Sequence, residues 1–283
     1  LSAKAISKRY GGRIGCADVS FELFPGEVMG VVGESGSGKS TLLSCLAGHL
    51  TPDGGQVIFD TRADGPRDTL TMSEPERRML ARTDWAFVHQ HARDGLRMGV
   101  SAGGNVGERL MAVGERHYGD IRGKATDWLG RVEIDAARVD DRPTTFSGGM
   151  QQRLQIARNL VTAPRLVFMD EPTGGLDVSV QARLLDLLRG LVRDMGLSAI
   201  IVTHDLAVVR LLADRGPESL FSAEWLLEDP NPMVRRQVLL ELRRFPDSLT
   251  LDNWLIALAL HYDGQDRFYR EAIGIAFTNR ESW

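Results

Sequence analysis

One eight-residue segment constrains the fold of this chain more than any other. Residues 33–40 are Gly-Glu-Ser-Gly-Ser-Gly-Lys-Ser; they follow the apolar run Val28–Val32 and precede a stretch with helical spacing that starts near Lys39. Glycines in such a loop let backbone N–H groups curl around phosphate oxygens, and the helix that follows adds partial positive charge. The pattern therefore predicts a strand–loop–helix unit that holds the phosphates of a nucleotide.

The side chains of this loop have separable expected roles. Lys39 is expected to reach the outer phosphates, and the hydroxyl of Ser40 is placed to ligate Mg²⁺. The formal net charge of −4 gives no long-range attraction for nucleic acid, so phosphate must be held by this local site and nucleic acid is not an expected partner. The other expected nucleotide contacts of the segment are Gly33, Glu34, Ser35, Gly36, Ser37, Gly38 and Thr41.

The composition describes an ordinary globular protein. Of the 283 residues, 43% are hydrophobic and 25% charged, and no apolar run approaches the roughly 18 residues of a membrane span. The N-terminus has no charged-then-apolar leader pattern, so we expect a cytoplasmic protein, free or peripheral to the inner membrane. Cys16 and Cys45 lack metal-ligand spacing, and we expect them to form neither a disulfide nor a metal site.

Short apolar runs alternate with helical patterns from Ser2 to about Arg215. This alternation predicts an α/β fold with a largely parallel sheet, while residues 71–140 are predicted to be mostly helical. The runs 28–32, 166–169 and 199–202 are continuously apolar, as strands covered on both faces should be. Each run ends in polar residues, and ligands sit beyond the carboxyl ends of parallel strands, so the three polar endings are expected to face one site.

Two carboxylates follow the second of these runs. Asp170 is expected to hold Mg²⁺, directly or through water, and Glu171 to polarise the water that attacks the terminal phosphate. Acidic residues at a strand end also occur as helix caps or in solvated turns. The phosphate loop at residues 33–40 favours the functional interpretation.

Residues 146–153, Phe-Ser-Gly-Gly-Met-Gln-Gln-Arg, resemble the signature sequence of ABC ATPases. The resemblance implies a P-loop NTPase cassette that binds ATP and Mg²⁺ and hydrolyses ATP when two copies meet. Ser147 and the backbone at Gly148 and Gly149 would contact the terminal phosphate of ATP held by the second copy, at a helix N-terminus. Gln151 is the remaining nucleotide contact expected in this segment.

The same resemblance assigns roles outside the three motifs. Tyr10 lies where the family stacks an aromatic ring on adenine, and Gln90 where a glutamine touches Mg²⁺ and relays the nucleotide state. Asp177 corresponds to the aspartate that crosses the dimer interface, and His204 to the histidine that contacts the terminal phosphate. The expected catalytic residues are thus Lys39, Glu171 and His204, and the expected metal ligands are Ser40, Gln90 and Asp170.

Three stretches narrow the resemblance within the family. Residues 94–96, 100–110 and the unusual Gly-Gly-Leu-Asp at 174–177 resemble the ATPase subunit of the carbon–phosphorus lyase system. That resemblance implies docking on the soluble core complex that breaks down phosphonates. The alternative is the ATPase of a dipeptide or nickel importer, which shares residues 34–40 and 178–181 and would pair with a membrane permease subunit. Because the region after Gln90 makes the partner contact, we favour the lyase system.

The resemblance covers residues 1–215, with a helical subdomain at about 93–159. Residues 216–283 are predicted to be all helical, with amphipathic helices near 234–245, 254–260 and 268–277. They resemble HEAT-like repeats of bacterial haem-binding or dehydrogenase-like proteins and stand where the family has two further strands and closing helices. A natural fusion, a rearranged frame and a designed chain all fit this join. A third alternative is therefore a truncated, chimeric cassette that binds ATP without turnover.

Overall fold

The computed structural model describes residues 1–33, 36–203, 235, 249–262 and 272. The chain divides into two compact units, Leu1–Thr203 and His204–Trp283. The boundary predicted after Arg215 lies outside the described residues. The first unit contains all the motifs described above except His204.

The strands that carry the chemistry form a four-stranded parallel sheet. Its members are β3 (Val28–Val32), β6 (Trp85–Val88), β7 (Leu166–Asp170) and β8 (Ser198–Thr203), in the order β3-β8-β7-β6. The predicted apolar strands are confirmed, and β7 and β8 are buried along almost their whole length. The sequence does not predict β6, because four residues between two helical patterns carry little periodicity of their own.

A second sheet, which the sequence does not predict, is antiparallel. It consists of β1 (Ser2–Tyr10), β2 (Arg13–Glu22), β4 (Gly54–Thr61) and β5 (Gly65–Asp68), in the order β2-β1-β4-β5. For the described residues, the expectation of one largely parallel sheet is therefore corrected to one parallel and one antiparallel sheet of four strands each. These strands expose one face, so their polar and charged residues hide the strand pattern that continuous apolar runs reveal.

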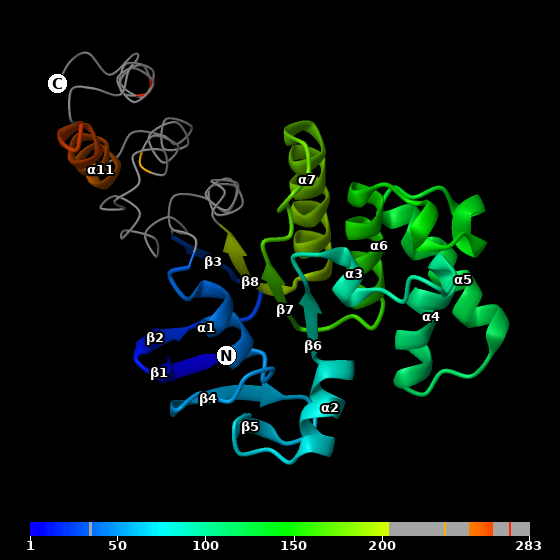
Figure 1. The fold of residues 1–283 in the computed structure, drawn as a ribbon, viewed down its shortest axis with the longest axis horizontal. Coiled ribbons are helices and arrows are strands. Elements are labelled where there is room, and N and C mark those ends of the chain that lie inside the picture. The colour runs from blue at the N-terminus through cyan, green and yellow to red at the C-terminus, as the bar shows by residue number, and fades with distance from the viewer. Residues whose placement is uncertain (34–35, 204–234, 236–248, 263–271, 273–283) are drawn as a thin grey trace. The chain divides into compact units, whose positions relative to one another are not determined.

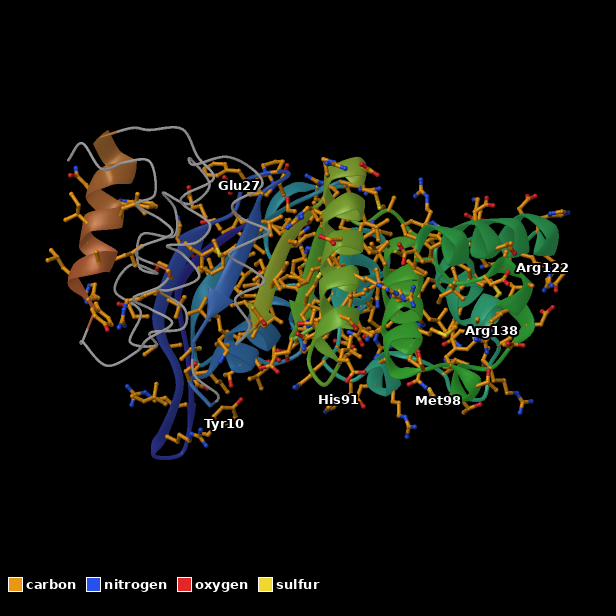
Figure 2. All side chains as sticks on the ribbon, turned by 90° about the horizontal axis from the view of Figure 1, so that it is seen from above. Tyr10, Glu27, His91, Met98, Arg122 and Arg138 are labelled. Atoms are coloured by element: carbon orange, nitrogen blue, oxygen red, sulfur yellow. The ribbon has the colours of Figure 1, made fainter. Side chains whose placement is uncertain are left out.

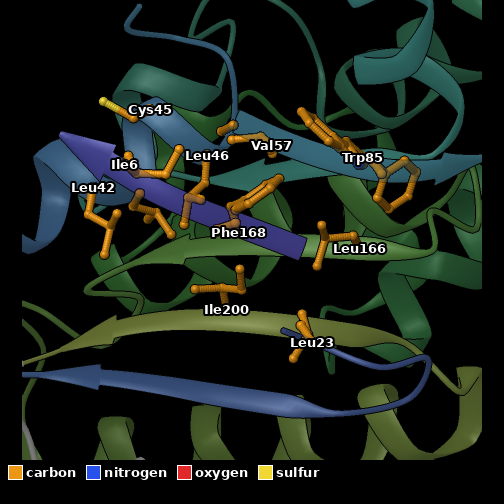
Figure 3. Close-up of a cluster of buried hydrophobic side chains, with 14 of the residues drawn as sticks. Ile6, Leu23, Leu42, Cys45, Leu46, Val57, Trp85, Leu166, Phe168 and Ile200 are labelled. Atoms are coloured by element: carbon orange, nitrogen blue, oxygen red, sulfur yellow. The ribbon is translucent and has the colours of Figure 1, made fainter. Parts of the chain in front are cut away.

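The two sheets share one hydrophobic core with helix α1 (Lys39–Leu46), shown in Figure 3. Ile6 and Val57 come from the antiparallel sheet, Leu46 from α1, and Phe168 from the parallel sheet; all four are fully buried. Burying a large aliphatic or aromatic side chain contributes about 1.5–3 kcal/mol. This packing fixes the start of α1, and with it the phosphate loop, against the end of β7.

Helices α3 to α6 lie together at one end of the first unit (Figure 1). Helix α1 begins at Lys39 as predicted, and Trp128, Leu129 and Val132 are buried as the predicted apolar stripe requires. The remaining elements are α2 (Glu74–Thr83), α3 (Ala92–Gly95), α4 (Ala102–Ala112), α5 (Tyr118–Arg131), η1 (Ala136–Asp140), η2 (Pro143–Thr145), α6 (Gly148–Leu160) and α7 (Val178–Met195).

In the second unit the structure describes one helix, α11 (Leu249–Leu260), which contains the predicted helix at 254–260. The helices predicted near 234–245 and 268–277 lie almost entirely outside the described residues. Among the residues that are described, no helix is both long and apolar enough to cross a membrane.

Candidate nucleotide site

The phosphate loop is shaped by glycine conformations and by a close neighbour. Gly36 and Gly38 have φ values of 83° and 94°, a left-handed region that residues with a Cβ rarely adopt. A Cβ at Gly38 would overlap the carbonyl of Gly15 on β2, so only glycine fits there. Glu34 and Ser35 lie outside the described residues. The loop therefore packs directly on the antiparallel sheet, a contact the sequence did not reveal.

Lys39 lies across this loop. Its side chain is buried, and Nζ donates hydrogen bonds to the Gly33 carbonyl at 2.8 Å and to Ser37 Oγ at 3.4 Å. Gly33 precedes the loop and Lys39 begins α1, so the ammonium group spans the space that the loop encloses. A cation held in this position is suited to neutralise phosphate oxygens bound by the loop.

Two of the three side chains expected to ligate Mg²⁺, Ser40 and Asp170, meet although they are 130 residues apart in the chain. Ser40 Oγ donates to Asp170 Oδ1 at 2.9 Å, which joins the start of α1 to the end of β7. Burial raises the pKa of the Asp170 carboxyl, with a further contribution from Glu171, while the Ser40 hydrogen bond opposes the rise. A hydroxyl and a carboxylate are the hard oxygen donors that Mg²⁺ prefers, so these residues fit the ion.

Within the described ranges, no group of three or more His, Cys, Asp or Glu side chains is placed so that it could hold a metal ion by itself. A magnesium ion at Ser40 and Asp170 would therefore need further oxygens from the nucleotide phosphates and from water. That is the usual way in which proteins hold Mg²⁺ beside a nucleotide.

Glu171 is held in an uncommon backbone conformation. Its φ is 42°, in the left-handed region, and its N–H donates to the Val202 carbonyl at 2.8 Å. Gln90 Nε2 donates to Glu171 Oε2 at 2.8 Å, so a side chain two residues beyond β6 reaches the residue that follows β7. Such conformations cost about 1–3 kcal/mol and cluster at functional sites. The surrounding bonds thus fix the carboxylate that the sequence assigns to water activation.

Tyr10 ends β1 at the tip of the β1–β2 hairpin, labelled in Figure 2. It is 50% exposed, and an ideal Cβ on Gly15 would lie 3.0 Å from its ring and 2.9 Å from the Thr41 methyl group. Gly15 therefore leaves room for an aromatic ring to lie beside the start of α1. Gly15 could not be singled out from the sequence.

The signature segment stands at the N-terminus of α6. Ser147 is exposed and caps the helix, because its Oγ accepts a hydrogen bond from the Met150 N–H at 3.3 Å. Gly148 is exposed beside it, whereas an ideal Cβ on Gly149 would lie 2.6 Å from Val180 on α7. Ser147 and Gly148 thus present polar groups at a helix start, where an anion is favoured.

Gln151, predicted as a nucleotide contact, holds the signature segment from inside. Its buried amide donates to the carbonyls of Pro143 at 2.9 Å and Phe146 at 3.1 Å. Its direct contact with nucleotide stays a prediction. Asp177 is exposed at the N-cap of α7 and makes no side-chain capping bond, and His204 lies outside the described residues.

Arg138 is a functional candidate that the sequence did not suggest. From η1 it donates to Asp141 Oδ2 at 2.7 Å and to Thr145 Oγ1 at 3.2 Å, and its guanidinium lies 4.5 Å from the Phe146 ring centre. It also lies 3.6 Å from Met150 Sδ. One planar group therefore braces the segment before Ser147 on several sides.

Fold and site together define a P-loop nucleotide hydrolase with a signature segment at the start of α6. A family model described as ABC transporter matches residues 16–174. This chain belongs to the ABC transporter ATPase family, and it is an ATP-binding, ATP-hydrolysing cassette.

Individual relatives of this chain are also ATP-binding proteins. A protein of Escherichia coli (strain K12) named for phosphonates utilization and ATP binding, PhnK, is 65% identical over 215 residues, covering 76% of this chain and 83% of its own. A peptide import ATP-binding protein of Brucella ovis is 35% identical over 220 residues, covering 76% of this chain and 67% of its own.

Solved structures show the same similarity. The cassette MJ0796, described as a dimer in a post-hydrolysis state bound to ADP and Pi, matches with a TM-score of 0.66 and 29% identity. The match covers 74% of this chain and 90% of that one. Similar cassettes therefore form dimers that bind nucleotide.

Proposed function

We propose that this chain is the ATPase subunit of a phosphonate-utilisation system and works as a homodimer. The observation that carries the proposal is its 65% identity to the E. coli protein named for phosphonates utilization, against 35% to the peptide import protein of B. ovis. The chain would dock on a soluble carbon–phosphorus lyase core complex rather than on a membrane permease.

The geometry supports a division of roles within each protomer. Lys39 and the loop amides would stabilise charge on the transferring phosphoryl group, and Glu171 would orient the attacking water. Ser40, Asp170 and Gln90 would surround Mg²⁺, which when bound neutralises charge on the phosphate oxygens. His204 would hold the terminal phosphate.

The signature segment would act on the other protomer. Ser147 and the backbone of Gly149 would contact the terminal phosphate of ATP bound by the partner copy, and Asp177 would lie at the interface. The exposure of Ser147 at a helix N-terminus supports this role.

Complementation tests the proposal. An E. coli strain that lacks PhnK should recover growth on a phosphonate as sole phosphorus source when it expresses this chain, and Lys39→Ala should abolish the recovery. Growth on inorganic phosphate is the control for toxicity. Expression of a stable, ATP-hydrolysing chain without recovery would contradict the phosphonate assignment and would favour the peptide importer, which a peptide-uptake strain would then test.

A further inference from the structure

Helix α6 does more than present Ser147, because its inner face holds the backbone of His89. Gln155 Oε1 accepts from the His89 N–H at 2.6 Å, and Gln155 Nε2 donates to the His89 carbonyl at 3.1 Å. Gln152 Nε2 donates to the same carbonyl at 3.1 Å. Gln155 is fully buried and Gln152 is 3% exposed.

These three hydrogen bonds from Gln155 and Gln152 to His89, called the clamp below, lie where strand β6 stops pairing with β7. β6 is an edge strand of the parallel sheet, and its ladder with β7 ends at the pair Val88 and Met169. The next residue, His89, has peptide groups that still need partners in the protein interior. The amide of Gln155 offers one acceptor and one donor, as a neighbouring peptide would, and so continues the ladder from a helix.

The clamp is part of a continuous series of contacts that runs from α6 to Glu171. His89 precedes Gln90, whose amide donates to Glu171 at 2.8 Å. Gln155 also bonds to Gln152 at 3.2 Å, so the two glutamines form one unit on α6. Hydrogen bonds thus connect α6 to His89, and the residue that follows His89 is bonded to Glu171.

We propose that Gln155 is a positioning residue that couples the two ATP sites of the dimer. This proposal rests on the proposed function. There, Gln90 contacts the ATP site of its own protomer, and Ser147, at the start of the helix that carries Gln155, contacts the ATP of the partner. A rigid link between them makes each protomer register the state of both sites. Positive cooperativity in ATP is the consequence.

The variant Gln155→Met tests the coupling, since methionine is similar in length and lacks the amide. The parent should show a Hill coefficient for ATP between one and the limit of two set by two sites. Gln155→Met should lower the Hill coefficient to about one and kcat about tenfold, while the affinity of the monomer for a fluorescent ATP analogue stays within about twofold.

Asn105→Leu is the matched control. Asn105 is also fully buried in a helix, and its amide bonds to the backbone of Arg97, Val100 and Ser101, but it does not touch His89. The variant Asn105→Leu should lose thermal stability as Gln155→Met does, but it should keep the parent's Hill coefficient. If Gln155→Met does not fold, Gln152→Met, which removes one of the three bonds, should lower the Hill coefficient part of the way.

The outcomes distinguish failure of the coupling from failure of the proposed function. A cooperative parent with an equally cooperative Gln155→Met, or with Gln152→Met unchanged where Gln155→Met does not fold, would overturn the coupling alone. An equal fall of the Hill coefficient in Asn105→Leu would also overturn it, because the effect would then follow stability. A parent that hydrolyses ATP without cooperativity would overturn the coupling alone, whereas a parent without turnover would overturn the proposed function and the coupling with it.

Discussion

The phosphate loop and the signature segment are two halves of one kind of site, yet they are built differently. On the phosphate-loop side, hydrogen bonds within one chain join Lys39 to the loop, Ser40 to Asp170, and Gln90 to Glu171. On the signature side, Ser147 is exposed, and its Oγ accepts a hydrogen bond that caps its own helix. In the proposed dimer, the phosphate-loop half, called the complete half below, lies within one protomer, whereas the signature half would act on ATP held by the other copy.

Lys39→Ala should have the largest effect, because it removes the buried cation of the complete half. We expect ATP binding by the monomer to weaken and turnover to fall by at least about 100-fold. Equilibrium binding of a fluorescent ATP analogue and phosphate release measure the two effects. Lys124→Ala, which removes an exposed pair with Glu115, should change neither. Normal ATP binding by Lys39→Ala would refute its role.

Ser147→Ala should affect turnover and spare binding, and so would sharpen the contrast between the halves. We expect kcat to fall about tenfold while the monomer binds ATP with unchanged affinity. The change also removes a helix cap, which costs about 0.5–2 kcal/mol. Ser101→Ala is the control, since Ser101 caps α4 in the same way. Equal losses of kcat in the two variants would show that Ser147 acts only as a helix cap.

Tyr10→Ala tests the adenine platform of the complete half. Loss of base stacking is worth about 1–3 kcal/mol, so the ATP analogue should bind at least about fivefold more weakly with kcat nearly unchanged. Tyr10→Phe keeps the ring and should behave like the parent. Equal affinity in Tyr10→Ala and the parent would place adenine elsewhere.

Arg138→Lys should give the smallest effect, because the charge remains and the planar fork is lost. We expect kcat to fall about threefold with ATP binding by the monomer unchanged. Arg131→Lys is the control, because its guanidinium also lies over an aromatic ring, 5.0 Å from the centre of Trp128, which is not part of the signature segment. A larger effect on ATP binding than on kcat would show that Arg138 acts on the phosphate-loop half of the site.

Motifs made of neighbouring residues could be predicted from the sequence. The phosphate loop, the start of α1 at Lys39, the carboxylates after β7 and the signature helix each depend on a local run of residues, and the structure places each element as expected. The division of ligands between β7 and α1 also followed from the rule that sites lie beyond the carboxyl ends of parallel strands.

Features that depend on contacts across the fold could not be predicted. The antiparallel sheet shows no continuous apolar run, and the need for glycine at Gly15 appears only when Tyr10 and Thr41 lie beside it in the fold. Arg138 and Gln155 look like ordinary helix residues in the sequence, since an arginine is usually solvated and a glutamine exposed. Only the partners they meet in three dimensions give them a role.

The measurement that tests the central claim most directly is ATP hydrolysis by the purified full chain as a function of its concentration, with Glu171→Gln alongside. A dimerising ABC ATPase should show turnover that rises more steeply than the protein concentration, and Glu171→Gln should bind ATP and abolish turnover. Turnover strictly proportional to concentration at every dilution, or equal turnover in Glu171→Gln, would contradict the claim. ATP binding without any turnover by the parent would instead indicate a cassette that its C-terminal residues leave inactive.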